Sequence, residues 1–325
     1  MNTKIPPLLF IAFVAPLLAV TFSACSTGYA GDNAGQTSQP AGEAAGAASQ
    51  SVQLSWTVVR PPNDRYLDRQ WAYEPMRRMI GTGGGDKLIL VAVLDTGIDA
   101  MHEDLIGNVV DEVNFSGSQT AMDIYAHGTH VAGIIAAHAD NKIGIAGLSQ
   151  HARLINVKVA DDQGRVFPSD LAKGIVWAVD RGAQVINISL CISNGNGTLE
   201  KAVDYAWSKG VVIVAAAGNC RSAEQAPACY PHVISAGALD NQLEIWEKSN
   251  QGDCVNAYAP GVGIYSCRPD NSYGYVTGTS AAAAMISAAA AEFLTTAVDE
   301  NANGFVNDEV FTRLKGAFAY SSGLD

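Results

Sequence analysis

The chain contains 325 residues, of which 48% are hydrophobic and 16% charged, so it can bury a large core and cannot be mostly disordered. Its formal net charge is −12. Nucleic-acid binding needs a positive field, so this charge argues against a nucleic-acid partner. Six cysteines are too few for a mini-fold built on disulfides, but they suit an exported protein with a few cross-links.

The N-terminal residues are typical of an export signal. Lys4 provides a positive start, residues 8–20 are almost entirely apolar, and small residues then precede Cys25. The motif FSAC that ends there resembles the lipobox of bacterial lipoproteins. We therefore expect a signal peptide at residues 1–24 and a lipidated Cys25 that attaches an exported protein to a membrane of the cell envelope. The alternative is cleavage after Ala30, which would release a secreted protein.

The next segment differs from the rest of the chain in composition. Residues 25–55 are mainly Gly, Ala, Ser, Gln and Thr, and such a stretch cannot offset its ordering entropy. We expect a flexible tether there, followed by one domain at residues 56–325. We expect the protein to be a monomer.

Within the domain, short runs of β-branched residues alternate with longer alanine-rich segments. The runs predict strands at residues 88–94, 154–159, 185–190 and 211–215, and the intervening spacing predicts helices at 130–139, 168–181 and 199–209. Ser169 is the expected cap of the second helix. Nearly continuous apolarity indicates strands that are covered on both faces. The sequence therefore predicts an α/β three-layer sandwich with a mainly parallel central sheet and helices on both faces.

Three separated motifs carry polar residues suited to nucleophilic catalysis. Asp95 ends a buried strand, although taken alone it would be read as a turn or capping residue. His127 opens the motif HGTHVAG, in which His127 and His130 could form a zinc pair. No glutamate completes the zinc-helix pattern, so zinc is not expected. Ser280 lies in the motif GTSA before an alanine-rich helix, where alone it would be an N-cap.

Together, and in this chain order, the three motifs resemble those of the subtilisin-like serine peptidases (subtilases, peptidase family S8). The resemblance implies that residues 56–325 are the catalytic domain. It also implies that Asp95 orients His127, that His127 takes a proton from Ser280, and that Ser280 forms an acyl-enzyme. No cofactor is needed for this chemistry. His130 is then a packed helix residue.

A fourth motif supports the resemblance. The segment AAAGN at residues 215–219 ends a predicted strand and matches the oxyanion segment of the family. Asn219 would donate its side-chain amide to the developing oxyanion, beside the backbone N–H of Ser280. The alternative is an asparagine in a left-handed turn.

The resemblance also implies where a polypeptide substrate binds, as an added extended strand. The residues expected to line the cleft are Gly164, Arg165, Val166, Ser189, Leu190, Cys191, Ala216, Ala217 and Gly218. Cys191 stands where the family usually has glycine, so the shape of the specificity pocket is open. Arg165 could favour acidic substrate residues, but a solvated loop arginine is the preferred interpretation.

Structural calcium is the metal that the resemblance implies, with thermitase-like features near the N-terminus. Its expected ligands are Asp64, Asp104, Ala139, Asn141, Ile143 and Ile145, with solvated surface acids as the alternative. Residues 299–306 look like the first half of an EF-hand loop, but Val310 replaces the final acid, so a polar loop is favoured. Some relatives pair cysteines where Cys229 and Cys254 lie; the states of Cys191, Cys220 and Cys267 stay open.

We therefore expect an exported serine endopeptidase that hydrolyses peptide bonds. One alternative is a catalytically silent peptide-binding scaffold, which the intact triad and Asn219 argue against. The other is a peptide transamidase or cyclase that uses the same acyl-enzyme, and no added domain is evident to exclude water. The sequence does not reveal the physiological substrate or the cleavage specificity.

Overall fold

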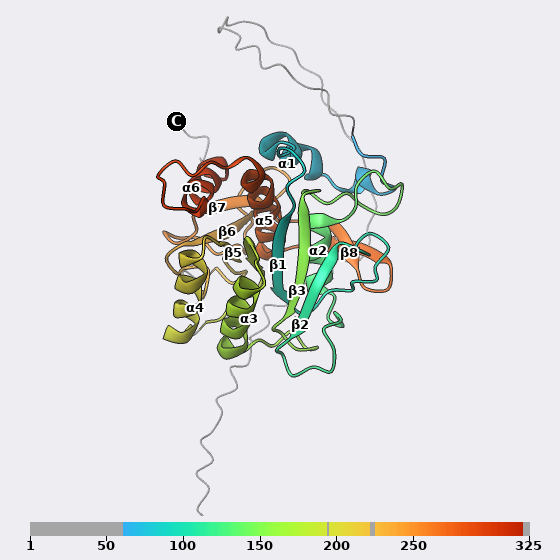
Figure 1. Cartoon of the computed structure of the whole chain (residues 1–325). Coiled ribbons are helices and arrows are strands. Elements are labelled where there is room, and N and C mark those ends of the chain that lie inside the picture. Colours follow the sequence, from blue (N-terminus) through green and yellow to red (C-terminus); the bar gives the residue numbers. More distant parts are fainter. Residues whose placement is uncertain (1–60, 194, 222–224, 321–325) are drawn as a thin grey trace, which may run out of the picture.

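The structure is a computed structural model that describes residues 61–193, 195–221 and 225–320 (Figure 1). The predicted signal peptide, Cys25, the tether and the first residues of the predicted domain lie outside the described residues. Within the described part of the chain, no helix is both long and apolar enough to cross a membrane.

The centre of the molecule is a seven-stranded sheet in which every pair of neighbouring strands is parallel. The spatial order is β2-β3-β1-β4-β5-β6-β7. The strands are β1 (Ile89–Asp95), β2 (Val109–Asn114), β3 (Ala152–Lys158), β4 (Val185–Ile188), β5 (Val212–Ala216), β6 (Val233–Leu239) and β7 (Ala257–Pro260). Parallel neighbours must be joined by crossover connections, and helices provide several of them.

Helices cover both faces of the sheet (Figure 1). One face carries α3 (Pro168–Asp180) and α4 (Gly197–Ser208); the other carries α1 (Tyr73–Ile80), α2 (His127–Ala136), α5 (Thr279–Thr296) and α6 (Asn307–Ala317). A short η1 (Leu67–Arg69) precedes α1, and an antiparallel hairpin of β8 (Ile264–Arg268) and β9 (Ser272–Val276) packs beside α2. The predicted α/β three-layer fold is confirmed.

The structure has one hydrophobic core on each face of the sheet, and side chains along β1 point alternately into the two. Ile89, Val91 and Val93 pack against the α2 and α5 face, whereas Ala92 and Leu94 pack against the α3 and α4 face. All five side chains are fully buried. A strand buried on both faces must be apolar at every position, which is why the sequence showed a continuous apolar run.

Two predicted details are wrong. The helix expected at 130–139 begins earlier, at His127, and ends at Ala136. Ser169 does not cap α3: it lies inside the first turn, after Pro168, and Phe167 is the N-cap residue without a side-chain cap bond. Proline at the first helical position fixes a helical φ and needs no N–H partner, so the helix starts there rather than after the serine.

The strand register brings the predicted catalytic motifs to one edge of the sheet. Leu94 pairs with Ile188 across β1 and β4, and Ile188 pairs with Ala215 across β4 and β5. Asp95, Ser189 and the residues after Ala216 therefore follow these pairs at the carboxyl ends of three adjacent strands. Ligands bind at this edge in open α/β sheets.

Candidate active site

Asp95 and His127 form a hydrogen-bonded pair although they are 32 residues apart. The distance between Nδ1 of His127 and Oδ1 of Asp95 is 2.7 Å. The same carboxylate oxygen accepts the backbone N–H of Thr96 at 2.7 Å. The Asp95 side chain is completely buried, whereas 18% of the His127 side chain is exposed. The carboxylate thus fixes one ring nitrogen and leaves the ring edge open toward solvent.

The charges around His127 favour its protonated form. Burial by itself would lower the pKa of His127, but the charge of Asp95 and the hydrogen bond to it raise that pKa above its usual value of 6.5. A general base that must hold a proton during the reaction is more effective when a negative partner such as Asp95 stabilises its protonated form. His130 behaves differently, because burial lowers its pKa to about 3 and keeps it neutral.

The second histidine of the motif is packed inside the fold. His130 is buried within α2, and among the described residues its Nδ1 has no hydrogen-bond partner. In the described part of the chain, no three His, Cys, Asp or Glu side chains gather in a way that could hold a metal ion. His130 is therefore a packed helix residue, as the sequence indicated.

A glycine in the motif HGTHVAG allows α2 to approach β1. A Cβ atom placed on Gly128 would lie 2.0 Å from the carbonyl oxygen of Gly97, in the turn that follows Asp95. Any side chain at this position would push the helix away from the strand end. The distance between Asp95 and His127 therefore depends on Gly128.

Ser280 is the second residue of α5 and is 8% exposed. Its Oγ donates a hydrogen bond to the carbonyl oxygen of Ser189 (3.0 Å), and Oγ of Ser189 donates to the carbonyl oxygen of Ser280 (3.1 Å). Asn187 in turn donates to Oγ of Ser189 at 2.9 Å. The side chain of Ser189 therefore supports the first turn of α5, and only its backbone remains to contact a substrate.

The side chain of Asn219 is oriented by its neighbours. Its Oδ1 accepts both the backbone N–H and the hydroxyl of Thr279, each at 2.9 Å. With the oxygen occupied, the Nδ2 group remains as a donor beside the start of α5. A Cβ atom on Gly278 would lie 3.0 Å from this Nδ2, which explains the glycine before Thr279. The left-handed turn in this loop belongs to Gly218 (φ 107°) and not to Asn219.

Gly164, Arg165 and Val166, which were predicted to form one wall of the cleft, differ in their contacts and in their burial. Gly164 has φ 75°, and the ring of Tyr125 packs over it. Arg165 forms an ion pair with Asp161 at 2.7 Å inside its own exposed loop. Val166 is buried in the core. The Arg165 side chain is 58% exposed, in agreement with the solvated loop arginine that was preferred from the sequence.

The opposite wall is mainly buried. Leu190, Ala216 and Ala217 are all at most 9% exposed. The thiol of Cys191 is half-buried and donates to the carbonyl oxygen of Ala216 at 3.3 Å, so it links β5 to the segment after β4. Burial raises the pKa of Cys191 to about 12, which keeps the thiol protonated and weakly reactive.

A disulfide joins Cys229 and Cys254, with an S–S distance of 2.02 Å. Cys267 is buried beside α2, and burial raises its pKa well above the usual value. Such a thiol is inert, so the structure gives Cys267 a packing role.

The residues predicted to bind calcium are brought together near the N-terminal segment. Asp64 accepts the backbone N–H groups of Asp140 and Asn141 at 3.0 and 3.4 Å. Asp104 accepts the Asn141 side-chain amide and the backbone N–H of Ile145, both at 2.8 Å. Ala139 and Ile143 lie in the same loop, where the carbonyl of Ile143 accepts the N–H of Arg65.

Two buried carboxylates from separate segments therefore face the loop that follows α2. Asp64 is 6% exposed and Asp104 is completely buried. Burial raises the pKa of Asp64, and the charge of Asp104 adds to this rise. In the described residues, neither carboxylate has a Lys or Arg within 4.0 Å. Hard oxygen donors with uncompensated charge fit a calcium ion.

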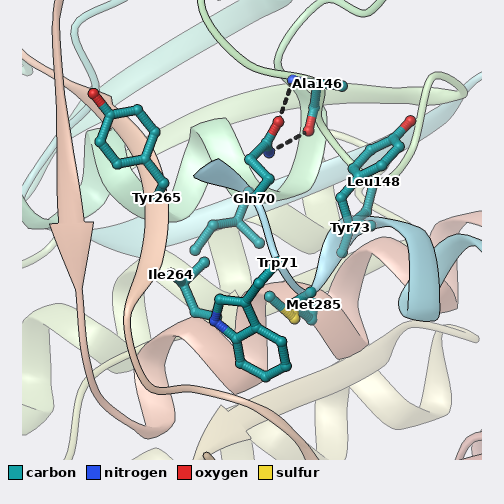
Figure 2. Close-up of a pocket in the computed structure, with 10 residues that line it drawn as sticks. Gln70, Trp71, Tyr73, Ala146, Leu148, Ile264, Tyr265 and Met285 are labelled. Atoms are coloured by element: carbon teal, nitrogen blue, oxygen red, sulfur yellow. Dashed lines mark hydrogen bonds between the residues drawn. The ribbon is translucent and has the colours of Figure 1, made fainter. Parts of the chain in front are cut away.

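A pocket of about 300 Å³, including its opening, lies away from the catalytic candidates Asp95, His127 and Ser280 (Figure 2). The N-terminal segment covers it, and the indole of Trp71 and the side chains of Ile264 and Met285 give it an apolar wall. Gln70 closes one end by hydrogen bonds to both backbone groups of Ala146, at 2.8 and 2.9 Å. No catalytic candidate lines this pocket, so it carries no part of the chemistry.

Sequence reasoning did not single out Thr96, Asp123 and Lys158. All three are at most 1% exposed and lie around the Asp95–His127 pair. The available signal was weak: a lysine in the middle of an apolar strand, and an aspartate four residues before the histidine motif.

Comparison with known proteins gives a consistent family. The model of the Subtilase family (Peptidase S8) matches residues 86–308. The chain is 42% identical over 232 residues to a thermophilic serine proteinase of Bacillus sp. (strain AK1), which covers 71% of this chain and 56% of that protein. It is 40% identical over 228 residues to thermitase of Thermoactinomyces vulgaris (68% and 81%) and 38% identical over 244 residues to subtilisin DY of Bacillus licheniformis (73% and 88%). The chain belongs to the subtilase family of serine endopeptidases.

Proposed function

We propose that the chain cleaves polypeptides through Asp95, His127 and Ser280, with Asn219 as an oxyanion donor. The observation that carries this proposal is the 2.7 Å hydrogen bond between buried Asp95 and His127. It lies at the sheet edge where α5 presents Ser280. A serine hydroxyl is a poor nucleophile at neutral pH unless an aligned base takes its proton.

The first half of the reaction forms the acyl-enzyme. The Ser280 hydroxyl leaves the carbonyl of Ser189, transfers its proton to Nε2 of His127, and its Oγ bonds to the substrate carbonyl carbon. The negative charge that develops on the substrate oxygen is stabilised by Nδ2 of Asn219 and by the backbone N–H of Ser280. His127 then returns the proton to the leaving amine as the peptide bond breaks.

The second half releases the acyl group. A water molecule gives a proton to His127 and attacks the acyl carbon, and His127 then protonates Oγ of Ser280 as the new carboxylate leaves. Asp95 stays ionised throughout, holding the imidazole in position and stabilising its cationic form. This cycle consumes water and needs no cofactor.

The substrate is proposed to be an extended polypeptide that pairs with the backbone on both sides of the catalytic serine. The support is the position of Gly164 in the loop between β3 and α3 on one side, and of Ser189 to Cys191 after the end of β4 on the other. Main-chain pairing gives affinity, and side-chain pockets give specificity. The Cys191 thiol, which contacts the carbonyl oxygen of Ala216, would narrow the specificity pocket between the ends of β4 and β5.

Calcium is proposed as a structural ion. Asp64, Asp104 and Asn141 would hold it with carbonyl oxygens of Ala139, Ile143 and Ile145, and it would neutralise the two buried carboxylates. Binding would tie the segment at Asp64 to the loop after α2, so a chelator is expected to lower the melting temperature of the wild type. An Asp64→Asn variant should show a smaller response, and an unchanged melting temperature in the wild type would refute the site.

Export is proposed from the N-terminal signal, with lipidation of Cys25 or release after Ala30 as the two outcomes. Mass spectrometry of the mature N-terminus distinguishes them, because only lipidation leaves a diacylated Cys25 as the first residue. A Cys25→Ala variant that still fractionates with membranes would argue against the lipid anchor.

The decisive experiment for the catalytic proposal is labelling with a fluorophosphonate, which reacts with activated serines. Wild type should be labelled at Ser280 and should hydrolyse peptides, and Ser280→Ala should do neither. A folded wild-type protein that is neither labelled nor active would show a silent site. Products longer than the substrates would show transamidation instead.

A further inference from the structure

We propose that Asp123 is a positioning residue for His127, which fastens the first turn of α2 to the end of β1 and places a second negative charge near the imidazole. This inference rests on the proposed roles of Asp95, His127 and Ser280. Asp123 lies four residues before His127, in the loop that leads into α2, and its side chain is completely buried.

Five donors converge on the Asp123 carboxylate. They are Oγ1 of Thr96 (2.8 Å), the backbone N–H of Tyr125 (3.1 Å), that of Ala126 (2.9 Å), that of Thr129 (2.8 Å) and Oγ1 of Thr129 (2.7 Å). Ala126, the N-cap residue of α2, has a left-handed φ of 75° and no side-chain cap of its own. Asp123 therefore supplies the acceptor that the first turn of the catalytic helix needs.

Thr96 connects this carboxylate to the catalytic one. Its backbone N–H donates to Oδ1 of Asp95, and its hydroxyl donates to Oδ1 of Asp123. The same hydroxyl accepts the backbone N–H of Gly128 at 3.0 Å, directly after His127. Both members of the Asp95–His127 pair are thus held through one threonine.

A buried lysine holds the other side of the same turn. Lys158 pairs with Asp95 in the β3–β1 register and is completely buried. Its Nζ donates to the carbonyl oxygens of Thr96 and Met122 and pairs with Asp162 at 2.9 Å. It therefore ties the residue after Asp95 to the residue before Asp123. Buried side chains thus join the three segments that position the catalytic pair.

The hydrogen bonds around Asp123 identify its charge state. Every contact to the carboxylate comes from a donor, so the ionised form satisfies all of them. Burial, with a smaller contribution from the charge of Asp95, raises the pKa of Asp123 above its usual value, and the hydrogen bonds from Thr129 and Thr96 offset part of this rise. After Asp95, the charge of Asp123 also favours the protonated form of His127.

The other titratable groups near His127 do not duplicate this effect. His130, on α2 itself, is neutral because burial lowers its pKa to about 3. Lys158, from β3, is held by the Thr96 and Met122 carbonyls and by Asp162. Asp95, from β1, already faces Nδ1. Asp123 is the second anion of the site, and it adds to the stabilisation of the imidazolium formed in the reaction.

The test is an Asp123→Asn variant of the full chain, assayed for kcat and KM on a peptide substrate across roughly pH 5 to 9. We expect kcat to fall about 10- to 100-fold, because the helix start loses its anchor, with KM within about twofold. The acid limb of kcat/KM should move to lower pH, because the remaining charges favour the imidazolium less. A matched control is Asp99→Asn, which alters another buried carboxylate that makes no contact with Thr96, Tyr125 or Ala126. It should leave the acid limb in place.

Two variants of Thr96 keep the test informative if Asp123→Asn does not fold. Thr96→Val removes the hydroxyl link but leaves the charge of Asp123, so kcat should fall while the acid limb stays in place. Thr96→Ser keeps the hydroxyl and should restore kcat. Unchanged kcat in Thr96→Val, or an unmoved acid limb in folded Asp123→Asn, would overturn the proposal. Because wild type is measured in parallel, an inactive wild type would instead indicate failure of the proposed catalytic function.

Discussion

The part of the chain that the structure describes contains two histidine–carboxylate pairs, at opposite ends of the central sheet. Asp95 and His127 meet at the carboxyl end of β1. Glu292 and His151 meet at the other end, just before β3, with Nδ1 of His151 3.1 Å from Oε2 of Glu292. In both pairs the carboxylate is at most 1% exposed and the histidine side chain is 18–19% exposed. Helix α5 connects them, because it carries Ser280 in its first turn and Glu292 near its end.

The difference lies at the second ring nitrogen. In His151, Nε2 contacts the carbonyl oxygen of Gly85 at 3.0 Å, so both nitrogens face acceptors and the ring is locked. Among the described residues, Nε2 of His127 has no hydrogen-bond partner, so it is available to a hydroxyl. A buried carboxylate beside a histidine is therefore not sufficient for catalysis; the ring also needs one free nitrogen.

The largest expected difference between the two pairs is the effect on kcat of replacing each histidine by alanine. His127→Ala should lower kcat by about 10⁴-fold, because Ser280 loses its base, while the fold is retained. His151→Ala should leave kcat within about twofold of wild type, because no group of that pair reaches the sheet edge where Ser280 lies. Steady-state kinetics with the melting temperature of each variant check this. Equal losses of kcat in both would contradict the comparison.

The next largest effect on kcat is expected from Asn219, whose side-chain amide is a donor at the catalytic end of the sheet. Asn219→Ala removes the Nδ2 group that would stabilise the oxyanion, and we expect kcat to fall about 10²- to 10³-fold with little change in KM. That range is the one measured for the corresponding kind of donor in subtilisin, a member of this family. The variant should still react with a fluorophosphonate, though more slowly. A proportional rise in KM would place Asn219 in substrate binding instead.

The Glu292–His151 pair should affect stability alone. Glu292→Gln removes the buried carboxylate that faces Nδ1 of His151 and lies 4.0 Å from Arg77. Allowing for the partial exposure of both partners, we expect the free energy of unfolding to fall by about 2 kcal/mol. Denaturant unfolding measures this change, with Glu74→Gln, at a side chain that is 47% exposed, as a control that should be nearly neutral. A loss of kcat without a loss of stability would refute the structural role.

Much of this organisation was predictable from sequence. Strands β1, β3, β4 and β5 are buried on both faces, so their continuous apolar runs gave their positions. Asp95, His127, Asn219 and Ser280 each lie in a motif whose glycine has a steric reason visible in the structure, such as Gly128 against Gly97. These short motifs were therefore sufficient to predict the catalytic residues from the sequence.

Other features depend on contacts between distant segments. Strand β2 is half-exposed and contains Asp111 and Glu112, so it lacks an apolar run. The start of α2 is set by the Asp123 carboxylate rather than by a capping residue next to the helix. The pair of His151 with Glu292 spans 141 positions, and no local pattern predicts it.

The smallest effect we expect is a pH dependence that only the catalytic pair should show. Burial would lower the pKa of His127, but Asp95 raises it above the usual 6.5. Protonated His127 cannot take the proton of Ser280, so kcat/KM should fall as the pH drops through this raised pKa. Stability should follow the opposite direction: the ion pair with Asp95 contributes most below about pH 6.5, and that contribution is lost as the pH rises through the raised pKa. The pH profile of kcat/KM for wild type and His151→Gln should coincide, because His151 lies at the far end of the sheet. An acid limb that moves in His151→Gln would show that the two pairs are coupled through α5.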